Sequence, residues 1–86
     1  MNPVWDDDAA DELADIWVAA TPEERDVIER AVLRVNRELV ENPEIGETRI
    51  GDSRVHFSSP LTVWYSIDPD LRVPLVFGVR LHRTKR

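Results

Sequence analysis

The spacing of the apolar residues changes once along this chain of 86 residues. Over residues 7–41 they recur every three or four positions, which places them along one side of a helix. From Arg54 onward they alternate with polar residues, as in strands that bury one face. This change constrains the fold more than any other feature. It predicts two helices followed by a sheet, which is an α+β fold.

The helical region divides at the sequence TPEE, residues 21–24. Thr21 can cap a helix, the proline after it suits the first helical position, and Glu24 completes a capping box. We therefore expect helices at about 7–20 and 22–41, joined with almost no linker as an antiparallel hairpin. The apolar stripe of the second helix is expected to contain Val27, Ile28, Ala31, Val32, Val35 and Leu39.

Turn lengths decide which side chains share a face of the sheet. Strands are expected near 53–58, 61–67 and 72–82, with NPVW as either a short first strand or a lead-in. A three-residue turn at 58–60 would place Phe57 opposite Leu61, and the odd-numbered residues would then lie under the helices. The even-numbered residues would form the uncovered face, namely Arg54, His56, Thr62, Trp64, Ser66, Arg72, Arg80 and His82.

Charge is divided unevenly along the chain. Residues 1–47 hold fourteen acidic and four basic residues, whereas residues 48–86 hold three acidic and seven basic ones, within a formal net charge of −6. This division indicates either ordinary solvated surfaces or a basic C-terminal half that binds an anionic partner. The chain has no cysteine, which excludes disulfides and thiolate metal sites. It shows no membrane-spanning apolar run and no signal-peptide pattern, so we expect one cytoplasmic domain over residues 1–86.

Four stretches of the sequence resemble the RelE/ParE superfamily of bacterial toxins. ADELADIW is similar to the family's first helix, and IERAVLRVNRELVENPEIGETR resembles its second helix with the Asn-Pro and glycine loop that follow. RVHFSSPLTVWYSID resembles two strands joined by a tight turn, and VPLVFGVRLHR resembles the last strand. The resemblance spans nearly the whole chain apart from a shortened first strand. It implies a helix hairpin packed on one face of a three- to four-stranded, mainly antiparallel sheet.

The resemblance also implies a function. Members of this family are toxins of type II toxin–antitoxin systems, and a cognate antitoxin protein holds them inactive. RelE-like members cleave mRNA in the ribosomal A site, and ParE-like members inhibit DNA gyrase. We expect a RelE-like mRNA interferase, which is an endoribonuclease that acts on translation. The residues leave two alternatives open: a ParE-like inhibitor that is not an enzyme, and a non-toxic relative that only binds an antitoxin.

Cleavage of RNA through its 2′-hydroxyl needs a base, an acid and cations that balance the charge developing on the phosphate. Arg54 and Arg80 are candidates for the cations, because a guanidinium binds phosphate through two hydrogen bonds. His82 is the candidate for proton transfer near neutral pH. Trp64 would either stack on a base or cover the sheet beneath a helix of a partner. The candidate RNA-binding residues are Trp64, Arg49, His56, Arg72 and Arg83.

Three departures from the family weaken the ribonuclease interpretation. RelE-like enzymes usually carry an arginine just before the core of the tyrosine-containing strand, where this chain has Leu61 or Thr62. Arg54 and His56 stand where lysines are common, and an acidic protein repels RNA. The basic even-numbered face and His82 favour the enzyme.

Neither histidine lies in a metal-ligand motif, so neither a metal nor another cofactor is expected.

Overall fold

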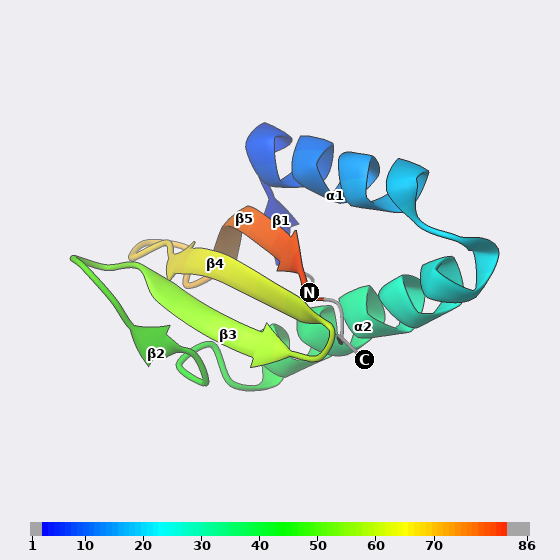
Figure 1. Cartoon of the computed structure of the whole chain (residues 1–86). Coiled ribbons are helices and arrows are strands. Elements are labelled where there is room, and N and C mark those ends of the chain that lie inside the picture. The colour runs from blue at the N-terminus through cyan, green and yellow to red at the C-terminus, as the bar shows by residue number, and fades with distance from the viewer. Residues whose placement is uncertain (1–2, 83–86) are drawn as a thin grey trace.

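A computed structural model describes residues 3–82 as two helices and a five-stranded sheet (Figure 1). The helices are α1 (Asp7–Ala19) and α2 (Pro22–Glu41), and the strands are β1 (Val4–Trp5), β2 (Glu47–Thr48), β3 (Arg54–Ser58), β4 (Leu61–Ile67) and β5 (Pro74–Leu81). The strand order is β1-β5-β4-β3-β2. The pair of β1 and β5 is parallel and the other pairs are antiparallel. The predicted α+β class is confirmed, but the sheet is mixed and has more strands than expected.

Both helices start at side-chain caps. Asp6 accepts a hydrogen bond from a backbone amide in the first turn of α1 at 2.8 Å. Thr21 and Glu24 form the predicted capping box, in which each side chain accepts a hydrogen bond from the backbone amide of the other residue. Arg25 donates to the carbonyl of Trp17 at 2.9 Å, which holds the end of α1 against the start of α2. The predicted helix bounds are confirmed to within one residue.

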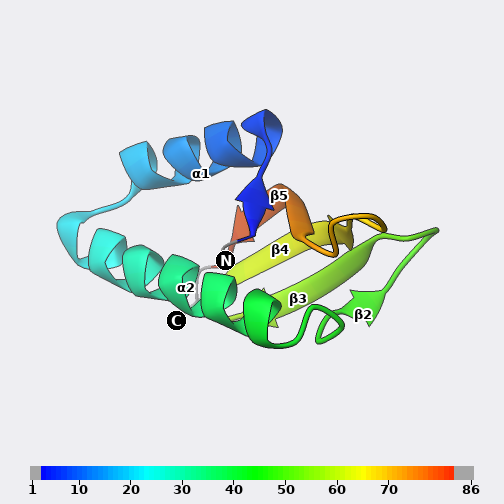
Figure 2. The same cartoon turned by 180° about the vertical axis from the view of Figure 1, so that it is seen from behind.

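The two helices cover the same face of the sheet but diverge from their junction. α1 lies against β5 and β1, whereas α2 lies across β3 and β4 (Figures 1 and 2).

Val27, which the periodicity placed in the apolar stripe of α2, is 47% exposed, whereas Ile28 is only 1% exposed. No helix within residues 3–82 is long and apolar enough to cross a membrane. The helices and the sheet share one core, formed by Ala9, Ala31, Val35, Leu39, Leu61, Val63, Tyr65, Val76 and Val79.

The hairpin between β3 and β4 differs from the prediction by one residue. Only Ser59 and Pro60, joined by a cis peptide bond, connect the strands, so that Ser58 pairs with Leu61. Side chains alternate along a strand, and a shift of one residue therefore turns every β3 side chain to the opposite face. The even-numbered residues of β3 lie under the helices. The predicted parity of β3 is wrong, because it assumed a turn of three residues.

A bulge changes the faces of β5 in the same way. Trp64 pairs with Gly78, but the next residue, Tyr65, pairs with Val76, which leaves Phe77 as an extra residue in β5. Val76 is fully buried and Phe77 is 42% exposed. The sequence pattern had placed Phe77 under the helices, and that placement is wrong. After the bulge, Val79 and Leu81 point toward the core, as the sequence pattern predicted.

Tyr65 fixes the loop that follows α2. Its buried hydroxyl donates to the carbonyl of Pro43 at 2.6 Å and accepts from the amide of Gly46 at 2.9 Å. A Cβ atom added at Gly46 would lie 2.8 Å from this hydroxyl, closer than real Cβ contacts allow. Burial raises the pKa of Tyr65. Tyr65 is therefore a structural anchor that requires glycine at position 46.

Candidate functional site

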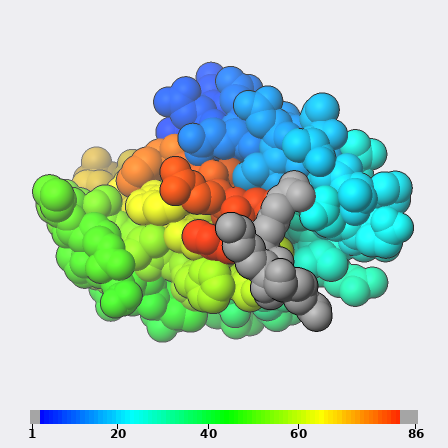
Figure 3. Space-filling view, viewed as in Figure 1, coloured from blue at the N-terminus to red at the C-terminus, as the bar shows by residue number. Residues whose placement is uncertain are grey.

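One face of the sheet carries no helix, and we call it the open face. Strand pairing places residues of three strands on it. They are Val55 and Phe57 from β3, Thr62, Trp64 and Ser66 from β4, and Leu75, Phe77, Gly78 and Arg80 from β5. His82 follows directly after β5. Figure 3 looks onto this face, where β3 and β4 in green and yellow and β5 in orange and red reach the surface below α1.

His82 is held at one end of the open face by contacts with β3 and β4. Its Nε2 atom is hydrogen-bonded to Thr62 Oγ1, and its ring meets that of Phe57 edge to face, with 5.7 Å between centroids. The backbone amide of His82 also donates to the carbonyl of Pro60 at 2.7 Å. Nδ1 has no hydrogen-bond partner among residues 3–82. The imidazole is therefore fixed in place, exposed, and able to exchange a proton at Nδ1.

Arg80 lies beside this cluster. Its guanidinium is 6.0 Å from the centre of the Trp64 ring, a cation–π contact, and the strand register places Arg80 directly opposite Thr62. Arg80 is exposed and forms no ion pair with any residue that the structure describes. Thr62 of β4 thus lies beside both the guanidinium of Arg80 and the imidazole of His82. The structure brings together three of the candidate residues, namely Trp64, Arg80 and His82.

Arg54 does not share this face, contrary to the expectation from sequence. It lies on the helix side of the sheet, where its Nη1 atom donates to the carbonyl of Gly46 at 2.9 Å and to that of Glu44 at 3.3 Å. The two-residue turn between β3 and β4 is the physical reason, because it reverses the direction of every β3 side chain. The guanidinium of Arg54 therefore supports the loop after α2 on the far side of the sheet from Arg80.

His56 is turned under the helices for the same reason. Its Nε2 atom donates to Glu38 Oε1 at 2.9 Å, and only 11% of its side chain is exposed. Burial by itself raises the pKa of Glu38. Hydrogen bonds from His56 and Ser58 and the charges of His56 and Arg34 outweigh that effect, so the pKa lies below its ordinary value of 4.5. The expectation that His56 faces RNA is wrong, because this side chain joins β3 to α2.

The remaining arginine candidates lie apart from the open-face cluster. Arg49 follows the edge strand β2, with its Nη2 atom 3.8 Å from a Glu47 carboxylate oxygen. Arg72 is exposed in the loop between β4 and β5, with a φ of 59°, at the opposite end of these strands from His82. Arg83 lies outside the described residues. The structure gives Arg49 and Arg72 no part in the cluster around Thr62.

Phe57 and Phe77 are open-face residues that the sequence analysis placed in the core. Phe57 is 61% exposed and Phe77 is 42% exposed. A two-residue turn at the SSP sequence would have predicted the direction of Phe57, because it reverses the parity of β3. The direction of Phe77 depends on the bulge, for which the sequence carries no signal that we identified. Together with Trp64 and His82 they make this face rich in aromatic rings.

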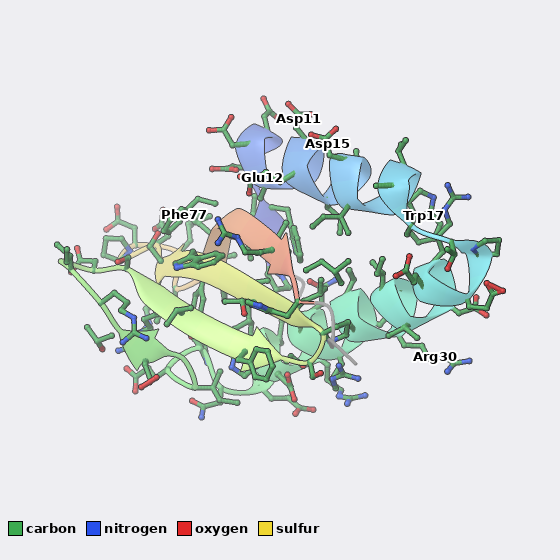
Figure 4. The ribbon with its side chains drawn as sticks, viewed as in Figure 1. Asp11, Glu12, Asp15, Trp17, Arg30 and Phe77 are labelled. Atoms are coloured by element: carbon green, nitrogen blue, oxygen red, sulfur yellow. The ribbon has the colours of Figure 1, made fainter. Side chains whose placement is uncertain are left out.

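A second surface feature lies between the diverging helices. It is an apolar groove of about 480 Å³, lined by Trp5, Ala10, Leu13, Ala14, Trp17, Val18, Val32 and Asn36. Trp5 is fixed in it by a hydrogen bond of 2.9 Å from Nε1 to Asn36 Oδ1. The α1 side of the groove belongs to a helix that has five acidic residues and no basic one, and Figure 4 labels Asp11, Glu12 and Asp15 among them. The groove therefore offers apolar contacts beside a negatively charged helix.

Residues 3–82 contain no group of three or more histidine, aspartate or glutamate side chains able to hold a metal ion. No family model matches the sequence, and a search of curated proteins finds no match either. The open face and the groove are therefore the observations from which a function can be argued.

Proposed function

We propose that this chain is the toxin of a type II toxin–antitoxin system, with a RelE/ParE-like fold and a RelE-like activity on mRNA bound to the ribosome. The observation that carries the proposal is the convergence of Trp64, Arg80 and His82 on the open face. The order of the helices and strands, which follows the resemblance seen in the sequence, supports the same family.

The chemistry proposed for this face is attack of a ribose 2′-hydroxyl on the adjacent phosphorus, which breaks the bond to the 5′-oxygen of the next nucleotide. Arg80 binds the phosphate and balances the charge that develops on it, and its guanidinium forms no ion pair with any carboxylate of the described residues. His82 accepts the proton of the attacking 2′-hydroxyl, water protonates the leaving 5′-oxygen, and Trp64 stacks on a neighbouring base. Within residues 3–82, His82 is the one open-face side chain suited to proton transfer near neutral pH.

The aromatic character of the same face favours a second candidate, a ParE-like inhibitor of DNA gyrase that is not an enzyme. Phe57 and Phe77 are both exposed beside Trp64, and aromatic residues are enriched in protein interfaces. Arg54 and His56 make structural contacts on the other side of the sheet, so residues 3–82 bring few cations to the open face. A non-toxic relative that only binds an antitoxin would be supported by the same features.

An antitoxin is the partner that this proposal requires. The groove between α1 and α2 suits an amphipathic helix whose apolar side contacts Trp5 and Trp17 and whose basic residues approach the acidic side chains of α1. We expect the native protein to purify together with a polypeptide encoded by the neighbouring gene. Purification of the native protein alone would argue against an antitoxin partner.

Induced expression in a bacterial host tests the enzymatic activity. We expect growth arrest and new 5′ ends within ribosome-bound mRNA, and we expect Arg80→Ala and His82→Ala to remove both effects. Loss of one charge-stabilising donor typically costs about 10²–10³ in rate. Arg30→Ala is the matched control, because Arg30 is exposed on α2, away from the open face (Figure 4). Growth arrest without mRNA cleavage would favour gyrase inhibition, and normal growth would argue against both toxin activities.

A further inference from the structure

The open face carries two exposed aromatic rings, those of Phe57 and Phe77, to which the proposed chemistry of Trp64, Arg80 and His82 assigns no role. The rings of Phe57, Trp64 and Phe77 come from three adjacent strands, and His82 adds a fourth ring at the end. Phe57 is the most exposed of the three phenylalanine and tryptophan side chains on this face. Its ring touches the imidazole that the proposed function assigns to proton transfer. Phe57 therefore lies next to the candidate catalytic histidine on the open face.

The fold does not need the Phe57 ring in this position. The neighbours of Phe57 along β3 point under the helices, where His56 binds Glu38 and Ser58 binds Arg34. The ring of Phe57 points the other way and is 61% exposed, so burial in the core does not explain it. Because Trp64 and Phe77 lie on the same face, the Phe57 ring is part of an aromatic surface, and such surfaces commonly mark interaction sites.

The charges of the open face select the kind of ligand. Arg80 is the one arginine that the described strands place there, and His82 is its one histidine. Each phosphate contact requires a cation, and the described residues of this face supply cations for only one or two phosphates. Duplex nucleic acid is bound chiefly through many phosphates, so the described part of this face does not favour it. Unpaired bases suit the surface better, because every base can stack on an aromatic ring.

We propose that Phe57 is a base-binding residue of the site, which stacks on an unpaired RNA base beside the phosphate held by Arg80. This inference rests on the proposed action of the open face on RNA. Among residues 3–82, it assigns RNA binding to stacking on Phe57 and Trp64 and to one phosphate contact made by Arg80. A consequence is that Arg80 contributes about −0.7 to the slope of log K plotted against log salt concentration.

Calorimetric titration of the full chain with single-stranded hexa-adenylate tests this inference. We expect Phe57→Ala to weaken binding by about 5- to 150-fold, the usual effect of losing one stacking ring. We expect Phe57→Tyr, which keeps the ring, to bind like the wild-type protein. Leu33→Ala is the matched control, because Leu33 is 63% exposed on α2 and should not affect RNA binding. Titrations of the wild-type protein and of Arg80→Ala at several salt concentrations should give slopes that differ by about 0.7, the value for one phosphate contact.

The inference is overturned if Phe57→Ala binds hexa-adenylate as tightly as the wild-type protein, or if Arg80→Ala leaves the slope unchanged. It is also overturned if the wild-type protein does not bind the oligonucleotide. In each case mRNA cleavage on the ribosome, measured separately with Arg80→Ala and His82→Ala, decides whether the proposed function survives. If Phe57→Ala instead abolishes binding to gyrase while RNA does not bind, the open face is a protein-docking surface.

Discussion

The Nε2 atom of His56 lies 2.9 Å from Glu38 Oε1, across the interface between β3 and α2. This contact gives an even-numbered residue of β3 a structural role on the covered side of the sheet. Its counterpart on the open face is the edge-to-face contact between Phe57 and His82. Neighbouring residues of β3 therefore lie on opposite faces of the sheet. His56 contacts α2, and Phe57 lies on the open face.

The lowered pKa of Glu38 makes the stability of the protein depend on pH. The carboxylate is favoured in the folded state relative to the unfolded value of 4.5. Its contribution is present above about pH 4.5 and is lost as the pH falls through the folded pKa. We expect Glu38→Gln to have a smaller loss of unfolding free energy than the wild-type protein between pH 6 and pH 3, as measured in urea. Glu41→Gln, at an exposed position of the same helix, is the control, and parallel wild-type and Glu38→Gln curves would contradict this role.

The same substitution at two neighbouring positions of α2 should destabilise the protein to very different extents. Ile28 is 1% exposed and Val27 is 47% exposed. Ile28→Asp would bury an unpaired charge and should cost about 3–5 kcal/mol in the free energy of unfolding. Val27→Asp leaves its charge in water and should cost less than about 1 kcal/mol. Urea unfolding checks both values, and equal losses would show that this facing of α2 is wrong.

Gly46 and Tyr65 form a second structural pair that can be tested. A methyl group at position 46 would meet the Tyr65 hydroxyl at 2.8 Å. We expect Gly46→Ala to destabilise the protein, because the buried tyrosine would have to move. Tyr65→Phe should cost about 1–3 kcal/mol, since it leaves the amide of Gly46 and the carbonyl of Pro43 without their partner. Thermal unfolding that is unchanged in both variants would refute the anchoring role of Tyr65.

Thr62 is expected to position His82 through the hydrogen bond between Oγ1 and Nε2. Thr62→Val has nearly the same shape without the hydroxyl, and it should lower the rate of mRNA cleavage and shift its pH profile. Thr62→Ser keeps the hydroxyl and should restore both. A purely structural role would predict that loss of activity follows loss of stability. Cleavage rates are therefore compared at a temperature where all three proteins are folded.

The sequence predicted the elements of this fold better than the faces of its strands. The capping box at Thr21 and the apolar periodicity located both helices, because these signals lie within a few consecutive residues. The direction of Arg54 and His56 depended on whether the SSP turn holds two or three residues, and composition does not distinguish these lengths. One residue in that turn decides which of Phe57 and His56 reaches the open face.

The bulge in β5 had a similar effect on the candidate site. It placed Phe77 on the open face although strict alternation from Val79 would have put it in the core. Trp64 and Arg80 were correctly placed together because the register between β4 and the last part of β5 is regular. Pairing of distant strands is set by tertiary contacts, so local patterns identified the strands but did not fix every register.

The most direct test is mRNA cleavage in a reconstituted translation system with four alanine variants. The account predicts that Arg80→Ala and His82→Ala lose cleavage by about 10²–10³ in rate. It predicts that Arg54→Ala and His56→Ala, measured at a temperature where they are folded, cleave like the wild-type protein. The reverse pattern, with activity lost in Arg54→Ala and His56→Ala and kept in Arg80→Ala and His82→Ala, would contradict the open face as the site of catalysis.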